Sequence, residues 1–258
     1  MKNQRKKPLI VAIVGKGGVG KTIVTTLIAK AISISYNFKL LLIDADPTHP
    51  HLSKMVNLLP EKSLEMVRAE LINKTINKKK DIQTLAENID FEVYSAIKES
   101  KDFSLFSIGQ PEGPGCFCPS NALLRKVIES ISSDFDVVLI DCEAGLEQIN
   151  RMVIKSVDII LIISDISLRS IETAKSIRKS AKKFTSYRKI GVIINRVKGD
   201  VTNILDKLRE FDLPLIALMP EDDIITKYDL EGKAIIDVPE DSKSFQKITN
   251  NIEKILEI

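Results

Sequence analysis

The chain has 258 residues, 44% hydrophobic and 28% charged, which is ordinary for a globular protein and long enough for one sizeable α/β domain over residues 1–258. Its formal net charge of +3, from 38 basic and 35 acidic residues, indicates neither a nucleic-acid partner nor a membrane surface. The apolar runs are strand-sized and the basic residues 1–7 lead to no cleavage-like site, so we expect a cytoplasmic protein with no membrane span. In that compartment its three cysteines would serve metal binding or packing rather than disulfides.

A glycine-rich stretch joins the first apolar run, Leu9 to Val14, to a helical pattern from Ile23 to Ser35. The stretch reads Gly15-Lys16-Gly17-Gly18-Val19-Gly20-Lys21-Thr22. It fits the phosphate-loop pattern, in which backbone N–H groups surround a phosphate. Lys21 would reach the β- and γ-phosphates and the Thr22 hydroxyl would bind Mg²⁺, beside the positive end of the helix. A glycine loop that only turns a strand into a helix would not require the Lys-Thr pair. The stretch therefore predicts a nucleoside triphosphate site.

Lys16 directly follows the first glycine of this loop, which gives the variant Lys-Gly-Gly-x-Gly-Lys-Thr. The variant resembles the deviant phosphate loop of the MinD/ParA and nitrogenase-iron-protein class of ATPases. The resemblance implies ATP and ADP as ligands and a homodimer that sandwiches nucleotide. In such a dimer Lys16 would cross the interface to the phosphates bound by the other subunit. The alternative is a solvated surface lysine beside the loop.

Two aspartates follow the next apolar run, Lys39 to Asp44. This run predicts a buried strand that places Asp44 and Asp46 at its carboxyl end, where open parallel sheets bind ligands. The motif Asp-Ala-Asp-Pro is similar to the first switch of the same ATPase class, which implies that Asp46 positions the attacking water. The alternative is that Asp46 caps the Asp-Pro turn. His49 and His51, the only histidines, are interpreted as polar loop residues rather than metal ligands.

The segment from about residue 60 to 101 is polar and rich in lysine. Its apolar residues recur at helical spacing near the start, so we expect two short helices joined by a solvated turn. The run Lys78 to Lys80 is interpreted as a solvated face rather than a docking site for an acidic partner.

Two cysteines lie in residues 109–119, after the strand-like run Phe103 to Ile108. The loop reads Gly-Gln-Pro-Glu-Gly-Pro-Gly-Cys-Phe-Cys-Pro, and its glycines and prolines predict an irregular, exposed backbone. Cys116 and Cys118 supply half of the four ligands that a soft metal prefers. A twofold axis would bring two such pairs together, so this loop and the phosphate loop predict the same homodimer. The alternatives are two packing residues or a strained redox pair.

The run from Asp134 to Asp141 predicts a strand that ends in a carboxylate. Asp141 is expected to be the Walker B residue that holds Mg²⁺ through a water molecule. The following Glu-Ala-Gly resembles the second switch of the class, in which Gly145 would let the backbone approach the γ-phosphate. Cys142 is interpreted as a packing residue, because it should point away from Asp141.

The Cys-x-Cys loop, together with residues 121–125 and 143–151, resembles the CooC-type ATPases, and the similarity covers nearly the whole chain. These maturation factors supply nickel to the Ni-Fe-S centre of carbon monoxide dehydrogenase. The resemblance implies that Cys116 and Cys118 bind nickel or zinc between subunits and that carbon monoxide dehydrogenase, or a related enzyme, is the client. Ile23 departs from the pattern by offering the phosphates only a backbone N–H. Gln148 stands where histidine is common, so it is assigned no role.

Two other classes of function remain open. One is a MinD/ParA-type positioning ATPase that acts on membrane or DNA, which would leave the Cys-x-Cys motif unexplained. The other is an electron-transfer protein like the nitrogenase iron protein, with an iron–sulfur cluster held between subunits by four thiolates.

The last third of the chain alternates strands and helices, which predicts a mostly parallel twisted sheet with helices on both faces. Asn195 and Arg196 end a strand-like run, and Asn195 resembles the adenine-reading residue of the class because its amide offers both a donor and an acceptor. Alternatively, Asn195 only caps the strand. Pro220, Glu221 and Asp222 resemble the segment that closes the base pocket. The strand-like runs are 158–163, 189–195 and 213–218, and the helical ones are 167–184 and 201–211.

A final helix is predicted from about Ser242 to Leu256. Its apolar residues recur at helical spacing, and acidic residues dilute its positive charge. We therefore expect this helix to pack on the sheet rather than to bind a membrane.

Overall fold

A computed structural model describes residues 7–46, 51–67, 69–70, 93–109, 129–142 and 157–257. These residues form a sheet with the strand order β3-β4-β2-β5-β1-β6-β7-β8. All strand pairs are parallel except β3 with β4, which confirms the predicted mostly parallel α/β sheet. The strands are β1 (Leu9–Gly15), β2 (Leu40–Asp44), β3 (Lys98–Glu99), β4 (Ser104–Ser107), β5 (Val137–Asp141), β6 (Ile159–Ser164), β7 (Lys189–Val197) and β8 (Leu215–Pro220).

The central strands are buried on both faces, which explains why they are nearly continuous apolar runs. Alternate residues of a strand point to opposite faces, so one strand contributes to two cores. In β1, Val11 and Ile13 join the core on one face of the sheet, whereas Ala12 and Val14 join the core on the other.

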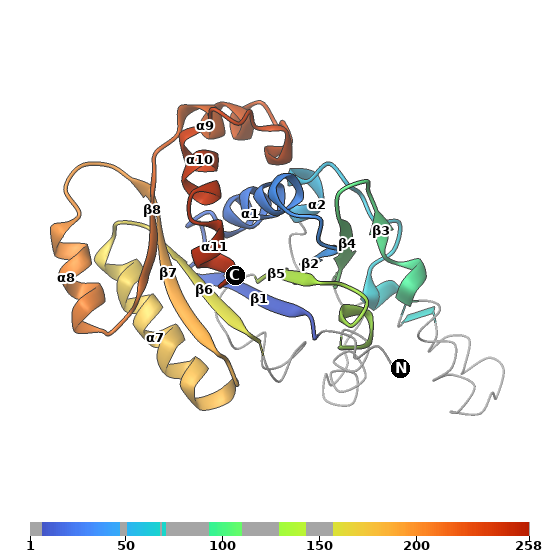
Figure 1. The fold of residues 1–258 in the computed structure, drawn as a ribbon, viewed down its shortest axis with the longest axis horizontal. Coiled ribbons are helices and arrows are strands. Elements are labelled where there is room, and N and C mark those ends of the chain that lie inside the picture. The colour runs from blue at the N-terminus through green and yellow to red at the C-terminus, as the bar shows by residue number, and fades with distance from the viewer. Residues whose placement is uncertain are drawn as a thin grey trace.

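Helices cover both faces of the sheet (Figure 1). The helix α1 packs with α10 and α11 on one face, and α7 lies with α8 on the other. The strand β1 lies in the middle of the sheet, with β5 and then β2 on one side and β6 and then β7 on the other. The strand order therefore reverses at β1. This arrangement places a ligand crevice at the carboxyl end of β1. The helices are α1 (Lys21–Ser35), α2 (Leu52–Met55), α7 (Leu168–Phe184), α8 (Thr202–Glu210), α9 (Asp223–Leu230), the 3₁₀ turn η1 (Ile235–Asp237), α10 (Lys243–Thr249) and α11 (Ile252–Leu256).

The predicted continuous helix at residues 242–256 is wrong, because the structure contains two helices there. Asn250 ends α10 and Asn251 precedes α11, and the Asn251 N–H bonds to the Ile248 carbonyl oxygen, three residues back, instead of continuing the α-helical pattern. The predicted packing is confirmed, since Phe245 and Ile255 are buried in the core that also holds α1.

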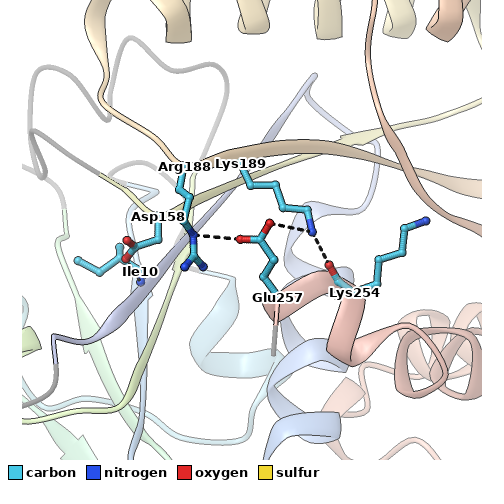
Figure 2. Close-up of polar contacts among 6 residues, drawn as sticks. All are labelled: Ile10, Asp158, Arg188, Lys189, Lys254 and Glu257. Carbon is cyan, nitrogen blue, oxygen red and sulfur yellow. Dashed lines mark hydrogen bonds and ion pairs between the residues drawn. The ribbon is translucent and has the colours of Figure 1, made fainter.

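The end of the described chain is tied to the edge of the sheet where strands begin (Figure 2). The Glu257 carboxylate lies 3.0 Å from Arg188 Nε and 3.6 Å from Lys189 Nζ, and Lys189 Nζ donates to the Lys254 carbonyl oxygen at 2.8 Å. Lys254 Nζ in turn donates to the carbonyl oxygens of Leu215 and Ile216 at the start of β8. No helix of the described residues is long and apolar enough to cross a membrane.

Candidate nucleotide site

The phosphate loop leaves the carboxyl end of β1 and enters α1 through close backbone contacts. A Cβ atom at Gly15 would lie 2.2 Å from the carbonyl oxygen of Ile163 in β6. Gly20 has a φ of +90°, and a Cβ there would lie 2.5 Å from the side-chain nitrogen of Asn195. Both positions therefore require glycine, for close approach at Gly15 and for both conformation and space at Gly20.

Lys21 and Thr22 begin α1, and both interact with Asp141 at the end of β5. Lys21 is only 9% exposed, and its ammonium donates to the Lys16 carbonyl oxygen at 3.2 Å. The Thr22 hydroxyl hydrogen-bonds to the Asp141 carboxylate. The loop residues Lys16, Gly17 and Gly18 are exposed. The loop thus combines the nearly buried ammonium group of Lys21 with an exposed backbone at Lys16, Gly17 and Gly18.

Asp141 is buried at the end of β5, directly beside the end of β2. Burial raises the pKa of this carboxyl to about 6, although hydrogen bonds from Thr22 and Thr25 and the charge of Lys21 favour its ionised form. The Thr25 hydroxyl lies 3.2 Å from Asp141 Oδ1. These contacts compensate only part of the cost of burying the charge.

Asp44 is the register partner of Asp141 on the adjacent strand. Its pKa is raised to about 7, first by burial and then by the negative charge of Asp141. Its oxygens accept from the backbone N–H groups of Asp46 and Leu52, each at 3.2 Å. Through these bonds Asp44 fixes the turn toward α2. The bonds compensate its negative charge only in part.

Asp46 is half-buried just after β2, and its charge raises the pKa of both Asp44 and Asp141. The structure thus brings three acids predicted for the site close to one another and to Lys21. In the described residues, no group of three or more His, Cys, Asp or Glu side chains could hold a metal ion on its own. A Mg²⁺ ion nevertheless fits these hard oxygen donors when phosphates supply further ligands, and its charge would relieve the repulsion among the acids.

Asn195 and Arg196, at the end of β7, contact the phosphate loop from the other side. Asn195 Nδ2 donates to the Val19 carbonyl oxygen at 2.9 Å, and Asn195 Oδ1 accepts from the Arg196 N–H at 3.0 Å. Arg196 has a φ of +55°, and its Nη1 donates to the Gly18 carbonyl oxygen at 3.3 Å. Both residues therefore support the loop, a role that sequence reasoning missed because the contact spans 176 positions.

A cavity of about 280 Å³ lies beside this support. Asn195 and Arg196 line it together with the three residues predicted to close a base pocket, Pro220, Glu221 and Asp222. Apolar side chains, including Ile23 and Met219, line the remainder together with the polar residues Thr226, Asp229 and Ser244. A cavity whose wall combines apolar side chains with polar groups is typical of a small-molecule binding site.

The Asp222 carboxylate, although near the cavity, is bound within the protein. It accepts from Ser242 Oγ at 2.7 Å, from the Ser244 N–H at 2.8 Å and from the Ile224 N–H at 3.0 Å. Burial opposes ionisation, but these hydrogen bonds hold the pKa of Asp222 below its usual range. Asp222 therefore shapes the cavity wall by joining α9 to α10.

Residues 10–235 match the family described as the CobQ/CobB/MinD/ParA nucleotide binding domain. The chain belongs to this family. An uncharacterised ATP-binding protein of Methanocaldococcus jannaschii is 35% identical over 96% of this chain and 98% of that protein. The carbon monoxide dehydrogenase accessory protein CooC of Rhodospirillum rubrum is 29% identical over 88% of this chain and 89% of that protein.

Solved structures share the fold of this MinD/ParA family member. The septum site-determining protein MinD of Pyrococcus horikoshii, complexed with Mg-ADP, has a TM-score of 0.71 at 22% identity and covers 96% of both chains. The cell division ATPase MinD of Pyrococcus furiosus has a TM-score of 0.69 at 24% identity and covers 95% of this chain and 98% of that chain. The phosphate-loop NTPase fold predicted from the sequence is thus confirmed.

Some predicted residues of this family member lie outside the described ranges. They are Cys116, Cys118 and Gly145, together with His49 and Gln148. Cys142 is described and buried, which agrees with a packing role, and burial strongly raises the pKa of its thiol. The metal and second-switch predictions therefore stay predictions.

Proposed function

We propose that this protein is a Mg²⁺-dependent ATPase that acts as a homodimer and delivers nickel to carbon monoxide dehydrogenase or a related Ni-Fe-S enzyme. One observation carries the ATPase part: a nearly buried lysine and a cluster of buried acids with raised pKa values meet beneath a phosphate loop. Burial and repulsion of these charges destabilise the nucleotide-free protein, and the binding of a cation and a phosphate would neutralise the charges. The Mg-ADP complex of the related MinD fold supports the same ligand pair.

The proposed residue roles combine this geometry with the resemblance of the sequence motifs to the deviant phosphate-loop ATPases. Lys21 and the loop N–H groups would hold the β- and γ-phosphates, and Thr22 with Asp141 would hold Mg²⁺, which neutralises phosphate charge. Asp46, beside Asp44 and Asp141, would orient the attacking water. The water oxygen bonds to the γ-phosphorus as the bond to the β–γ bridging oxygen breaks, giving ADP and phosphate. Lys16 is exposed and would serve the partner subunit's nucleotide.

The cavity lined by Asn195 and Pro220 would take the base. One N–H of the Asn195 amide and its oxygen already bond within the described part of the chain, where the amide has one N–H left to donate. Asn195 would therefore offer a donor to the ring and at the same time support the phosphate loop. The buried bonds of Asp222 would keep the pocket wall in place.

Phosphate release with Mg²⁺ and ATP tests the ATPase proposal. We expect the exchange of Lys21→Ala or Asp46→Asn to lower the rate about 100-fold or more, because each removes a group that acts on the transition state. Lys227→Ala, an exposed site on α9, is the control and should leave the rate unchanged. Full activity of Lys21→Ala would contradict the proposal.

The nickel part rests on the Cys-x-Cys loop in the sequence and on the name of the Rhodospirillum relative. A MinD-like role at a membrane remains the main rival. The C-terminal helices do not favour it, because the apolar face of α10 and α11 is buried against the sheet and Lys254 is bonded to backbone carbonyls. The nickel role therefore has more specific support than the membrane role.

Metal analysis and size exclusion, with and without ATP, separate the two roles. We expect nickel or zinc at about one ion per two chains in the wild type and loss of that metal in the double variant Cys116→Ser/Cys118→Ser. Nickel titration with ADP and with a non-hydrolysable ATP analogue should give different affinities, since coupling requires a metal affinity that depends on the nucleotide. Equal affinities would exclude nucleotide-driven delivery, and salt-dependent binding to anionic vesicles would favour the rival.

A further inference from the structure

Two adjacent threonines on α1 are fully buried but make different contacts. Thr26 Oγ1 lies 2.8 Å from the Thr22 carbonyl oxygen, one turn back in the same helix. Thr25 Oγ1 lies 3.0 Å from the equivalent Lys21 carbonyl oxygen but also 3.2 Å from Asp141 Oδ1. Among the described residues, Thr26 Oγ1 thus bonds only within its own helix, whereas Thr25 adds a contact to a residue 116 positions away.

A local packing role does not explain the contact of Thr25 with Asp141. Threonine is a poorer helix former than alanine or leucine, and valine would fill the same buried volume without a hydroxyl. The Thr25 hydroxyl has one proton and two acceptors within reach, one of them a buried carboxylate. A hydrogen bond to an ionised carboxylate is the stronger of the two.

Thr22 and Thr25 are three residues apart, so they lie on the same side of α1. Both hydroxyls bond to the Asp141 carboxylate, which therefore has two anchors on one helix. If Thr22 also ligates Mg²⁺, its hydroxyl must satisfy the ion and the carboxylate together. Thr25 does not begin the helix and has no such second task.

We propose that Thr25 is a positioning residue that holds the Asp141 carboxylate in the orientation needed for Mg²⁺ bound with the nucleotide. The inference rests on the proposed ATPase function and names a residue beyond the phosphate-loop and Walker B motifs. It predicts a defect in the use of Mg²⁺ rather than in the binding of phosphate. Residues behind metal ligands typically affect metal affinity 10- to 100-fold.

The test measures binding of a fluorescent ATP analogue as MgCl₂ is raised, with an EDTA arm for metal-free affinity. In Thr25→Val we expect the half-maximal Mg²⁺ concentration to rise about 10-fold, with metal-free affinity within about 2-fold of the wild type. Thr26→Val is the matched control, because it removes an equally buried hydroxyl, and it should change neither value. Thr25→Ser should restore the Mg²⁺ dependence to within about 3-fold of the wild type.

Equal Mg²⁺ dependence in Thr25→Val and Thr26→Val would overturn the inference. So would a Thr25→Ser variant as impaired as Thr25→Val, since that result would assign the effect to the methyl group. Circular dichroism checks the fold, and if Thr25→Val does not fold, Thr25→Ala is judged by the same two values. A wild type that binds the nucleotide without any response to Mg²⁺ would instead refute the proposed function itself.

Discussion

Asp222 and Asp141 are both buried aspartates near the carboxyl ends of strands, yet they differ in what surrounds them. Asp222 accepts from two backbone N–H groups and a serine hydroxyl, and its pKa is lowered. Asp141 is held by two threonine hydroxyls and a nearby lysine, and burial raises its pKa to about 6. The first carboxylate is fully satisfied by the protein, and the second is not.

The difference separates a structural acid from one that we propose binds Mg²⁺ with the nucleotide. Three donors repay the cost of burying Asp222, so it stabilises the join between α9 and α10. Asp141 lies against another poorly compensated acid, Asp44, whose pKa is about 7. Two buried acids that repel each other without ligand, and that a bound cation would stabilise, are typical of a binding site rather than of a structural contact.

The largest expected effect comes from removing the satisfied acid. Asp222→Ala should lower the free energy of unfolding by about 3 kcal/mol, because it leaves buried donors on Ser242 and Ser244 without their charged acceptor. Urea denaturation measures the loss. Asp223→Ala, an exposed acid at the next position, should cost less than about 1 kcal/mol. Equal losses in the two variants would show that the buried bonds of Asp222 contribute no more than an exposed acid does.

The second effect is the pH dependence of the nucleotide-free protein. Asp44 and Asp141 keep protons in the folded state at pH values where the unfolded chain has released them. The folded state therefore binds more protons, and the free energy of unfolding should fall as the pH rises from 4 to 7. Above the folded pKa values the fall should stop. Urea denaturation of the wild type and of Asp44→Asn at several pH values tests the sign of this effect. The prediction is wrong if the free energy of unfolding of the wild type, relative to that of Asp44→Asn, rises between pH 4 and 7.

A smaller gain should follow from neutralising one member of the unsatisfied pair. At pH 8, Asp44→Asn should raise the stability of the nucleotide-free protein by about 1 kcal/mol, because it removes a buried charge beside Asp141. The gain is limited because the amide oxygen can accept from only one of the Asp46 and Leu52 N–H groups, which bond to different oxygens of Asp44. Thermal melting with and without Mg²⁺ and ATP checks this expectation. The variant should also gain less from Mg²⁺ and ATP than the wild type does. Destabilisation as large as that of Asp222→Ala would show that both acids are structural.

The smallest effect concerns a partly exposed acid at the opposite edge of the sheet. Glu257 pairs with Arg188 and Lys189, and these side chains are 21 to 55% exposed. Glu257→Gln should therefore cost less than about 0.5 kcal/mol, as is usual for surface ion pairs. Chemical denaturation at low and high salt measures it. A loss above 2 kcal/mol would rank this contact with the buried bonds of Asp222.

Much of the fold was predictable from the sequence, because most strands are buried on both faces and read as apolar runs. Boundaries were less accurate. The run from Asp134 was predicted to be strand, but β5 begins at Val137, since the Asp136 carboxylate accepts from the Lys39 N–H just before the strands pair. The two-residue β3 has no readable pattern. The helix α9 was missed, although Asp222 is a typical N-cap residue and bonds to the Ile224 N–H.

The candidate site was likewise predictable from the sequence only in part. The phosphate loop could be predicted because its glycines, Lys21 and Thr22 are contiguous in the sequence and the role of each depends on its neighbours in the chain. The support of Val19 by Asn195 and the bond of Thr25 to Asp141 were not readable, because they join residues 176 and 116 positions apart. Such contacts depend on which strands become neighbours, and residue type alone does not specify that.

The anchoring of Glu257 beside the strand beginnings has a practical consequence for binding measurements. A dye or affinity handle attached just after Glu257 would sit at the opposite end of the strands from the glycine loop. Surface immobilisation through that point would leave the crevice and its rim open to solution. Binding of nucleotide and of the proposed client enzyme could then be measured on one tethered sample, with the label away from the loop.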